Sequence, residues 1–459
     1  MKRLFAICLA ASALASAGET EVDAVVRFAN EDRIEGTIES LTKDKLTLSS
    51  PILEKPAPFH LDKVLEVGLD AVYHDVDANH EAVVTLNLGD VIRGQLAEVT
   101  DEFVSLDTWY AGRLDIRRGM VASLEIEPKR EDLYHGPESI DDWVRSGDEN
   151  AWSYRRLALV ARGKGGIALP DVLPDQCSVT FDAAWKSDAL SLKVYLLTDE
   201  ADSESPESGY EVSIQRQSVY LRNCSKQRYL GSASSSGDLR ENTRARIELR
   251  ASSKNGRVVM LVNGRVIETW TDPDVADGDF GGALHFVSPN PGAMRISNIR
   301  VSRWNGVVDE TVPPRVPGQR FRIGGLPDDF SEAEDEPKDD KRMKLANSDS
   351  IDGEVKSISG GVITIETKLG EIKVPVSRFR TLALKPVEYD EAILRNGDVR
   401  AWFPDRTSMV FRLDSVDGGK LIGSSQNFGT AEFDIRAFSR IEFEIHNDEY
   451  DSLRGEEDW

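Results

Sequence analysis

The chain contains few cysteines, few histidines and far fewer basic than acidic residues. Its 459 residues include three cysteines and six histidines, and the formal net charge is −24. So few cysteines exclude a disulfide scaffold and a zinc site built on cysteine pairs. Such a charge repels nucleic acid and anionic lipid, and no lysine- and arginine-rich cluster overrides it. We therefore expect no nucleic-acid partner.

Long hydrophobic runs are missing as well, apart from a short one at the N-terminus. No stretch approaches the roughly 20 consecutive apolar residues of a membrane helix, so we predict no transmembrane segment. Residues 1–17 have a basic start, an apolar stretch and the small-residue sequence Ala15-Ser16-Ala17, which together are typical of a cleaved secretory signal peptide. We expect the mature protein in the periplasm or outside the cell.

Export would place two further cysteines, Cys177 and Cys224, in an oxidising compartment. These two thiols could form a single disulfide, and the alternative is two buried free thiols. No spacing rule separates the alternatives, so both stay open at this point.

One short phrase recurs along the chain as FANEDRIEGTI, LNLGDVIRGQL and LANSDSIDGEV. In each copy an aspartate is followed four residues later by a glycine. Asp tolerates turn conformations and Gly permits close backbone approach at a strand bend, so we predict that these residues shape a strand–turn–strand device. The predicted turn residues are Asp32, Gly36, Asp90, Gly94, Asp349 and Gly353.

A fourth copy emerges from the downstream part of the repeat. EVKSISGGVI, beginning at Glu354, matches RLDSVDGGKL, beginning at Arg412, at an offset of 58 residues. The same offset places Thr407 and Phe411 where the aspartate and glycine should stand. LRNGDVRAWF (394–403) also resembles the opening phrase, so the fourth unit has either a rebuilt first hairpin or an extra strand.

Each unit alternates apolar and polar residues, broken by Gly, Asp and Asn, as short antiparallel strands do. We predict four small SH3-like or Sm-like β-barrels at 22–70, 81–128, 343–386 and 391–447, with units adjacent in the sequence packed as pairs. The pattern resembles repeats in exported proteins of planctomycete-type bacteria. A Pro-rich and acidic linker at 309–342 precedes the third unit.

The middle of the chain, 140–305, has a different pattern of nine short strands without a helical run. Asn263-Gly264, flanked by alternating apolar residues, predicts a hairpin with a two-residue type I′ turn. The fold class is therefore all-β, with a central antiparallel two-sheet jelly-roll sandwich flanked by two pairs of barrel-like repeats. The predicted strands are 177–185, 190–197, 210–214, 218–222, 245–250, 258–262, 265–270, 283–288 and 294–304.

The ordered segments CSVTFDAAW, GYEVSIQRQSVYLRN, VVMLVNGRVIETW and ISNIRV resemble the concanavalin A-like lectin/glucanase (LamG-like) sandwich. They are most similar to its branch described as 3-keto-disaccharide hydrolase-like. The resemblance implies a glycan-binding or carbohydrate-active domain. Glucanase members use two nearby carboxylates on one strand, and neither Glu248 nor Glu268 stands in such a pair. Whether the protein is an enzyme is therefore left open, and absence of the acid pair favours a non-catalytic protein.

Candidate ligand and metal residues lie in the same domain. Sugar rings stack on exposed aromatic faces, and we expect ligand contacts from Trp185, Glu211, Tyr229 and Trp270. Calcium takes oxygen ligands and is a possible cofactor, although a solvated acidic turn explains the same aspartates; no other cofactor is indicated. This calcium candidate comprises Asp272, Asp274, Asp277 and Asp279. A connector with His74, Asp75, Asp77 and His80 is a weaker metal candidate.

Three functions are compatible with these observations. The leading hypothesis is an exported, non-catalytic binding or scaffold protein whose sandwich recognises a glycan or an envelope protein. The second is a carbohydrate-active hydrolase, for which Asp182 and Glu211 are the acids to replace first. The third is a structural component of the cell envelope.

Overall fold

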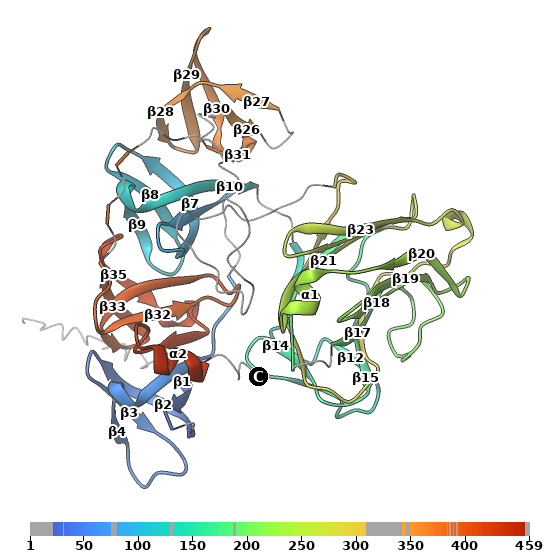
Figure 1. Ribbon diagram of the computed structural model, residues 1–459, viewed down its shortest axis with the longest axis horizontal. Coiled ribbons are helices and arrows are strands. Elements are labelled where there is room, and N and C mark those ends of the chain that lie inside the picture. The colour runs from blue at the N-terminus through green and yellow to red at the C-terminus, as the bar shows by residue number, and fades with distance from the viewer. Residues whose placement is uncertain are drawn as a thin grey trace, which may run out of the picture.

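The computed structural model describes residues 22–30, 32–74, 80–128, 132–186, 190–308, 342–345, 349–382, 384, 387–388, 390–391 and 393–454. The protein is all-β and antiparallel throughout. Four small repeat units are stacked in a column, and a two-sheet sandwich lies beside it (Figure 1). The predicted signal peptide and most of the predicted linker lie outside the described residues. No helix among the described residues is long and apolar enough to span a membrane.

The four units share one order of elements, with a short 3-10 helix before the last strand. Unit 1 comprises β1 (Asp23–Phe28), β2 (Arg33–Thr42), β3 (Lys45–Ser49), β4 (Ala57–His60), η1 (Leu61–Lys63) and β5 (Val64–Leu69). Unit 2 comprises β6 (His80–Leu86), β7 (Val91–Val99), β8 (Phe103–Thr108), β9 (Gly112–Arg117), η2 (Arg118–Met120) and β10 (Val121–Pro128).

Units 3 and 4 repeat this order after the sandwich, except that the second strand of unit 3 is divided into two. Unit 3 comprises β26 (Arg342–Leu345), β27 (Ser350–Asp352), β28 (Glu354–Ser359), β29 (Val362–Thr367), β30 (Gly370–Pro375), η4 (Val376–Arg378) and β31 (Phe379–Thr381). Unit 4 comprises β32 (Asp398–Trp402), β33 (Ser408–Asp417), β34 (Lys420–Ser425), β35 (Gly429–Asp434), η5 (Ile435–Ala437) and β36 (Arg440–Glu442), followed by α2 (Asp448–Arg454).

The first hairpin of every unit is closed by the same backbone hydrogen bond. In unit 2 the Leu86 amide donates to the carbonyl of Asp90 over 2.8 Å, and the corresponding bonds in units 1 and 3 end on Asp32 and Asp349. In unit 4 the Phe403 amide donates to the carbonyl of Thr407 over 2.8 Å. The offset of 58 is therefore confirmed, and the described part of the fourth unit has a rebuilt first hairpin and no extra strand.

The repeat glycines lie at close contacts between strands and not in the turn itself. A Cβ atom would lie 2.0, 2.9 and 2.7 Å from a backbone carbonyl oxygen at Gly36, Gly94 and Gly353 respectively. Real Cβ atoms do not approach so closely, so these positions need glycine. Unit 4 has Phe411 instead, and its ring lies where a Cβ on Gly423 of the next strand would be. In unit 4 the glycine that this close contact requires therefore stands on the third strand and not on the second.

The units pair across the inserted sandwich, which corrects the expectation that sequence neighbours pair. Units 1 and 4 share a ten-stranded sheet through β5–β36 and β2–β33, and units 2 and 3 share another through β10–β31 and β7–β28. Equivalent repeat positions face each other, Leu41 opposite Val416 and Val99 opposite Ile358. Each pair is thus an internal two-fold, self-complementary contact.

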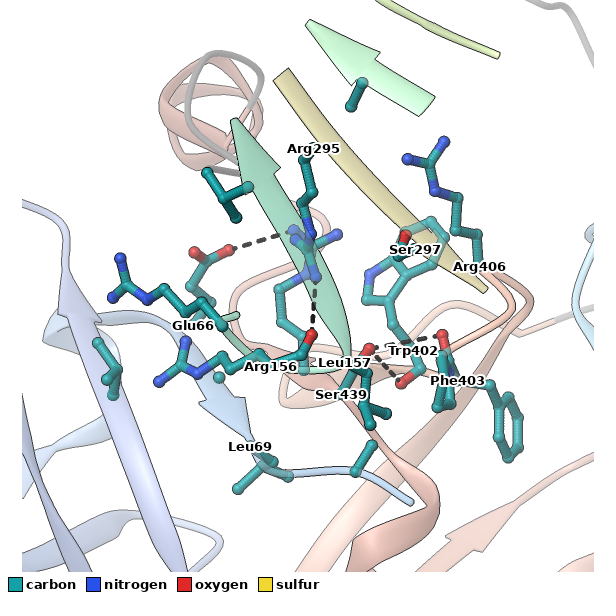
Figure 2. Close-up of a pocket in the computed structure, with 18 of the residues that line it drawn as sticks. Glu66, Leu69, Arg156, Leu157, Arg295, Ser297, Trp402, Phe403, Arg406 and Ser439 are labelled. Carbon is teal, nitrogen blue, oxygen red and sulfur yellow. Dashed lines mark hydrogen bonds and ion pairs between the residues drawn. The ribbon is translucent and has the colours of Figure 1, made fainter. Parts of the chain in front are cut away.

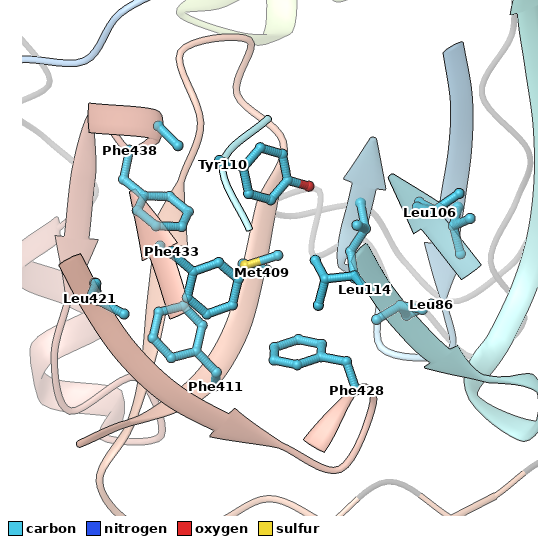
Figure 3. Close-up of a cluster of buried hydrophobic side chains, with 14 of the residues drawn as sticks. Leu86, Leu106, Tyr110, Leu114, Met409, Phe411, Leu421, Phe428, Phe433 and Phe438 are labelled. Carbon is cyan, nitrogen blue, oxygen red and sulfur yellow. The ribbon is translucent and has the colours of Figure 1, made fainter. Parts of the chain in front are cut away.

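A single hydrophobic cluster runs through all four units. Figure 3 shows its aromatic part in unit 4, where Phe411, Phe433 and Phe438 meet Tyr110 and Leu114 of unit 2. Phe411 and Phe433 stack with ring centroids 5.2 Å apart. Continuous burial of this kind joins the stacked units into one core, because removing apolar area from water is the main stabilising contribution.

The sandwich consists of an eight-stranded inner sheet and a seven-stranded outer sheet. The inner sheet comprises β11 (Asp132–Gly136), β13 (Trp152–Tyr154), β14 (Ala158–Ala161), β16 (Gln176–Trp185), β21 (Arg244–Ser252), β22 (Arg257–Val262), β23 (Arg265–Thr271) and β25 (Met294–Arg303). The outer sheet comprises β12 (Val144–Gly147), β15 (Gly165–Leu169), β17 (Ser191–Thr198), β18 (Tyr210–Gln215), β19 (Val219–Asn223), β20 (Arg228–Ser234) and β24 (Ala283–Ser288).

All nine predicted sandwich strands are confirmed within two residues at either end. Asn263 and Gly264 both have positive φ, 49° and 78°, as the predicted type I′ turn requires. Strands β11 to β15 and β20 were not predicted, and a short helix, α1 (Gly237–Glu241), follows β20. Cys177 lies in the sandwich core and Cys224 packs with Tyr195 and Val287, so both are buried free thiols and no disulfide joins them.

Candidate functional site

Two predicted ligand aromatics are core residues. Trp185 and Trp270 are 1% and 3% exposed and belong to the hydrophobic cluster between the two sheets. Both stand at strand ends, as expected, but their side chains point inward, so the prediction that they contact a ligand is wrong. Tyr229 is 62% exposed on β20, and its ring lies 6.0 Å from that of Tyr220.

Glu211 and Asp182 lie on different sheets and cannot act as a pair. Glu211, on the outer sheet, is buried and forms ion pairs with Arg222 and with Lys193 over 3.2 Å. Burial raises the pKa of Glu211, but hydrogen bonds and cation charges outweigh this effect and hold the pKa below its usual range. Asp182, on the inner sheet, faces the repeats. The two acids that were to be replaced first under the hydrolase hypothesis therefore do not converge on one site.

Two of the four aspartates proposed for calcium, Asp272 and Asp274, form structural contacts with their side chains. Asp272 is buried and accepts hydrogen bonds from Asn223 (2.6 Å) and Tyr210 (3.2 Å), while Asp274 pairs with Arg228 at 2.6 Å. Across the described part of the chain, no three His, Cys, Asp or Glu side chains are grouped to hold a metal ion. Of the weaker metal candidate, Asp75 and Asp77 lie outside the described residues.

The inner sheet turns a polar face toward the repeats. Alternation along its strands places Asp182, Glu248 and Arg300 on the side away from the core, and strand register sets Thr180 beside Glu248. Arg246 donates to both carboxylate oxygens of Asp182 over 3.0 and 3.2 Å. Glu248 has no acidic neighbour along its own strand, and it accepts hydrogen bonds from Ser178 of β16 over 2.8 Å and from Arg250 of β21 over 2.7 Å.

A cleft of 480 Å³ separates this face from units 2 and 4. Its volume is within the range of small-ligand sites. Arg93 on β7 is the central cation of its repeat side, because its guanidinium lies 3.0 Å from Glu81, 3.2 Å from Glu127 and 3.0 Å from Asp405. Arg93 thus joins three carboxylates from two units in one network.

Asp405 comes from the rebuilt hairpin of unit 4. Phe403, Pro404, Asp405 and Thr407 of this hairpin all line the cleft. The Asp405 backbone carbonyl accepts a hydrogen bond from Arg246 of the sandwich over 2.9 Å. The hairpin that departs from the repeat pattern therefore connects unit 2, unit 4 and the sandwich. That departure was the signal in the sequence that could have pointed to this site.

Aromatic rings complete the cleft wall. Tyr73 lies over His135 with ring centroids 3.9 Å apart, and His74 lies 4.9 Å from Trp109. Tyr110 donates its hydroxyl to the Arg93 carbonyl over 3.0 Å. Of these residues only His74 was predicted as part of a site, as a member of the weaker metal candidate, because the others belong to a connector and to turns that the repeat pattern does not distinguish.

The pKa values of two cleft acids, Glu81 and Asp405, are shifted in opposite directions. Burial raises the pKa of Glu81, and the neighbouring carboxylates of Glu127 and Asp405 add to this, while Arg93 opposes it. For Asp405 burial also acts upward, but Arg93 and the hydrogen bonds of Thr407 prevail and lower its pKa. Burial also lowers the pKa of His135 to about 3, so this imidazole is neutral at physiological pH.

The chain matches no family model and no curated protein. Among solved structures it is similar to the carbohydrate-binding module CBM66 from Bacillus subtilis, at 10% identity over 35% of this chain and 95% of the other, with a TM-score of 0.27. A protein of unknown function with a galectin-like fold, also from Bacillus subtilis, matches at 16% identity over 38% and 97%, with a TM-score of 0.30. The Emp46p carbohydrate recognition domain matches at 12% identity over 39% and 100%, with a TM-score of 0.27.

Proposed function

We propose that this is an exported protein that binds a carbohydrate in the cleft between the sandwich and units 2 and 4. The observation that carries the proposal is the convergence of aromatic rings and planar charged groups from three modules on one cavity. Aromatic faces stack on sugar rings, and guanidinium and carboxylate groups bond to hydroxyls. The four units serve as a rigid support, and their 3-10 turn before the last strand supports the SH3-like assignment.

Binding is expected to depend on Trp109 and not on the exposed Tyr229. A glycan array probed with the full chain identifies the ligand, and calorimetry then compares wild type with Trp109→Ala and Tyr229→Ala. We expect Trp109→Ala to weaken binding at least tenfold, because aromatic anchors carry much of a binding energy, and Tyr229→Ala to leave it unchanged. An array without any bound glycan, or loss of binding only in Tyr229→Ala, would refute the cleft as the site.

A hydrolase is the second candidate, favoured by the opposed pKa values of Glu81 and Asp405. When the pKa values of two acids in one cleft differ, the acid with the higher pKa can donate a proton while the other stays an ionised carboxylate. In this case the protein releases reducing ends from the oligosaccharide it binds, and the rate falls as pH rises through the pKa of Glu81. Glu81→Gln should reduce that rate at least 100-fold, whereas Glu102→Gln, an exposed acid of unit 2, should not change it. If wild type cleaves none of the oligosaccharides it binds, the hydrolase is excluded.

A further inference from the structure

Two kinds of contact between units alternate along the column. The order of the units is 1, 4, 2 and 3 (Figure 1). Units 1 and 4, like units 2 and 3, meet through paired strand edges. Figure 2 shows Leu69 of unit 1 near Trp402 and Ser439 of unit 4 at the first of these contacts, where the Leu69 amide donates to the Ser439 carbonyl over 2.9 Å. Units 4 and 2 meet through a different face of each unit. This stacking face, as we call it, contains the hairpin between the third and fourth strands, at 109–111 in unit 2 and 426–428 in unit 4.

The stacking contact between units 2 and 4 is self-complementary. Arg117 and Asp434 end the fourth strands of the two units and are equivalent positions of the repeat. The Arg117 amide donates to the Asn427 carbonyl over 2.8 Å, and the Asp434 amide donates to the Tyr110 carbonyl over 2.7 Å. The two donors are 317 residues apart in the sequence, and so are the two acceptors. Each unit therefore offers the same donor and the same acceptor, as in an isologous interface between two subunits.

Units 1 and 3 stand at the two ends of the column, and the hairpins of their stacking faces are exposed. Tyr110 of unit 2 is 4% exposed, whereas the residues that the offset of 58 places at this hairpin position, Ile52 of unit 1 and Leu369 of unit 3, are 75% and 100% exposed. These are the highest exposed fractions of large hydrophobic side chains among the described residues. On the fourth strand, Leu114 of unit 2 is 2% exposed and the equivalent Ile372 of unit 3 is 36% exposed.

The second strands show the same difference between inner and terminal units. Ile92 of unit 2 and Met409 of unit 4 are fully buried, whereas the equivalent Ile34 of unit 1 and Ile351 of unit 3 are only partly buried. The stacking face of unit 1 is also hollowed by a cavity of 540 Å³, whose lining includes Ile34 and Phe59. The same apolar positions are thus buried where two units stack and accessible where the column ends. Covering them would remove further apolar area from water, which favours association.

We propose that copies of this chain associate end to end, with the stacking face of unit 1 against the stacking face of unit 3 of the next copy. The contact between units 2 and 4 within one chain is the pattern for this contact between two chains. Because the two faces belong to opposite ends of the column, the association is head to tail and extends the column into a filament. It does not depend on the carbohydrate proposed for the cleft.

The lengths of the hairpins favour unit 3, and not a second unit 1, as the partner of unit 1. Two paired residues flank the hairpin in each unit, namely Leu48 and Ala57, Leu106 and Leu114, Ile365 and Ile372, and Gly423 and Ala431 in units 1 to 4. The hairpin of unit 1 is therefore one residue longer than those of units 2 and 4, and that of unit 3 is one residue shorter. A long hairpin against a short one keeps the combined length found between units 2 and 4. Two long hairpins would collide and two short ones would leave a gap, and protein contacts tolerate neither well.

Sedimentation velocity of the full chain, without carbohydrate and over a hundredfold range of concentration, tests the association. The sedimentation coefficient of wild type should rise with concentration. Ile52→Asp and Leu369→Asp should each weaken association at least tenfold, because the contact would bury an ionised carboxylate. Both side chains are exposed, so the melting temperature of the monomer should not change. Tyr229→Asp, at an exposed position of the outer sheet, is the matched control and should associate as wild type does. A wild type that stays monomeric, or association that fewer than both variants weaken, would overturn the proposal.

Cross-linking tests which faces meet. Arg117 donates to Asn427 between units 2 and 4, so the equivalent His60 of unit 1 should lie against Leu369 of unit 3 in the next copy. Under oxidising conditions, an equimolar mixture of His60→Cys and Leu369→Cys should form disulfide-linked dimers. Neither variant alone should form more dimers than wild type, which carries the same native cysteines. Dimers of either variant alone, or a mixture that forms no more dimers than wild type, would overturn the head-to-tail contact.

Discussion

Replacing Arg93 with methionine is expected to destabilise the protein by about 3 kcal/mol at pH 7. The substitution leaves Glu81, Glu127 and Asp405 without their shared cation in a largely desolvated place. Removal of one partner from a buried ion pair costs about 3–5 kcal/mol, and we take the lower end because Glu127 is 46% exposed. Urea denaturation followed by tryptophan fluorescence measures the change.

Two further measurements separate this effect from simple loss of packing. Acidification should reduce the deficit of Arg93→Met, because protonated carboxyl groups no longer repel each other. Arg113→Met is the matched control in the same unit, since Arg113 is exposed and pairs with Glu98 at 2.7 Å. Exposed ion pairs contribute little, so we expect no measurable change there. A deficit that is independent of pH, or equal in the two variants, would contradict the proposed network.

Replacing Asp90 with asparagine is expected to change how stability depends on pH. Burial raises the pKa of Asp90 from 3.8 to about 6, although its carboxylate accepts a hydrogen bond from the Val410 amide of unit 4 over 3.1 Å. The folded state binds this proton more tightly than the unfolded state does, so wild-type stability falls as pH rises from about 4 to about 6. The difference in pKa corresponds to about 3 kcal/mol.

The comparison is made as a difference between the two proteins at each pH. The asparagine side chain does not titrate, so the free energy of unfolding of Asp90→Asn should rise by about 3 kcal/mol relative to that of wild type between pH 3.5 and pH 7. A stability difference that the amide causes equally at every pH does not affect this comparison. Asp32→Asn is the control, because Asp32 is the equivalent residue of unit 1 and is exposed. Parallel pH profiles for wild type and Asp90→Asn would show that Asp90 is not the titrating group.

Asp90 also shows how a repeated residue acquires a second role. All four hairpins use the same backbone carbonyl position, and in unit 2 the Asp90 side chain also accepts a hydrogen bond from the Val410 amide of unit 4. Unit 4 has Thr407 at this position and uses the preceding Asp405 to contact both Arg93 and Arg246. The repeat pattern thus identifies the scaffold, and departures from it identify the contacts that build the cleft.

Local sequence determined the strands, the hairpins and the number of units. Alternation of apolar residues predicts strands because it depends only on near neighbours, and Asn263-Gly264 specifies its turn for the same reason. The offset of 58 residues likewise located the fourth unit from the sequence, although its first hairpin lacks the aspartate and glycine of the other units.

Tertiary structure alone decided which units pair, which face of each strand is buried and where the site lies. Units 1 and 4 pair because complementary strand edges meet in space, and sequence separation does not enter that choice. Alternation shows that Trp185 and Glu248 belong to strands, but it does not say which side faces the core, and here the tryptophan is inside and the acid faces the cleft. The cleft consists of residues from three modules, so its chemistry exists only when the chain is folded.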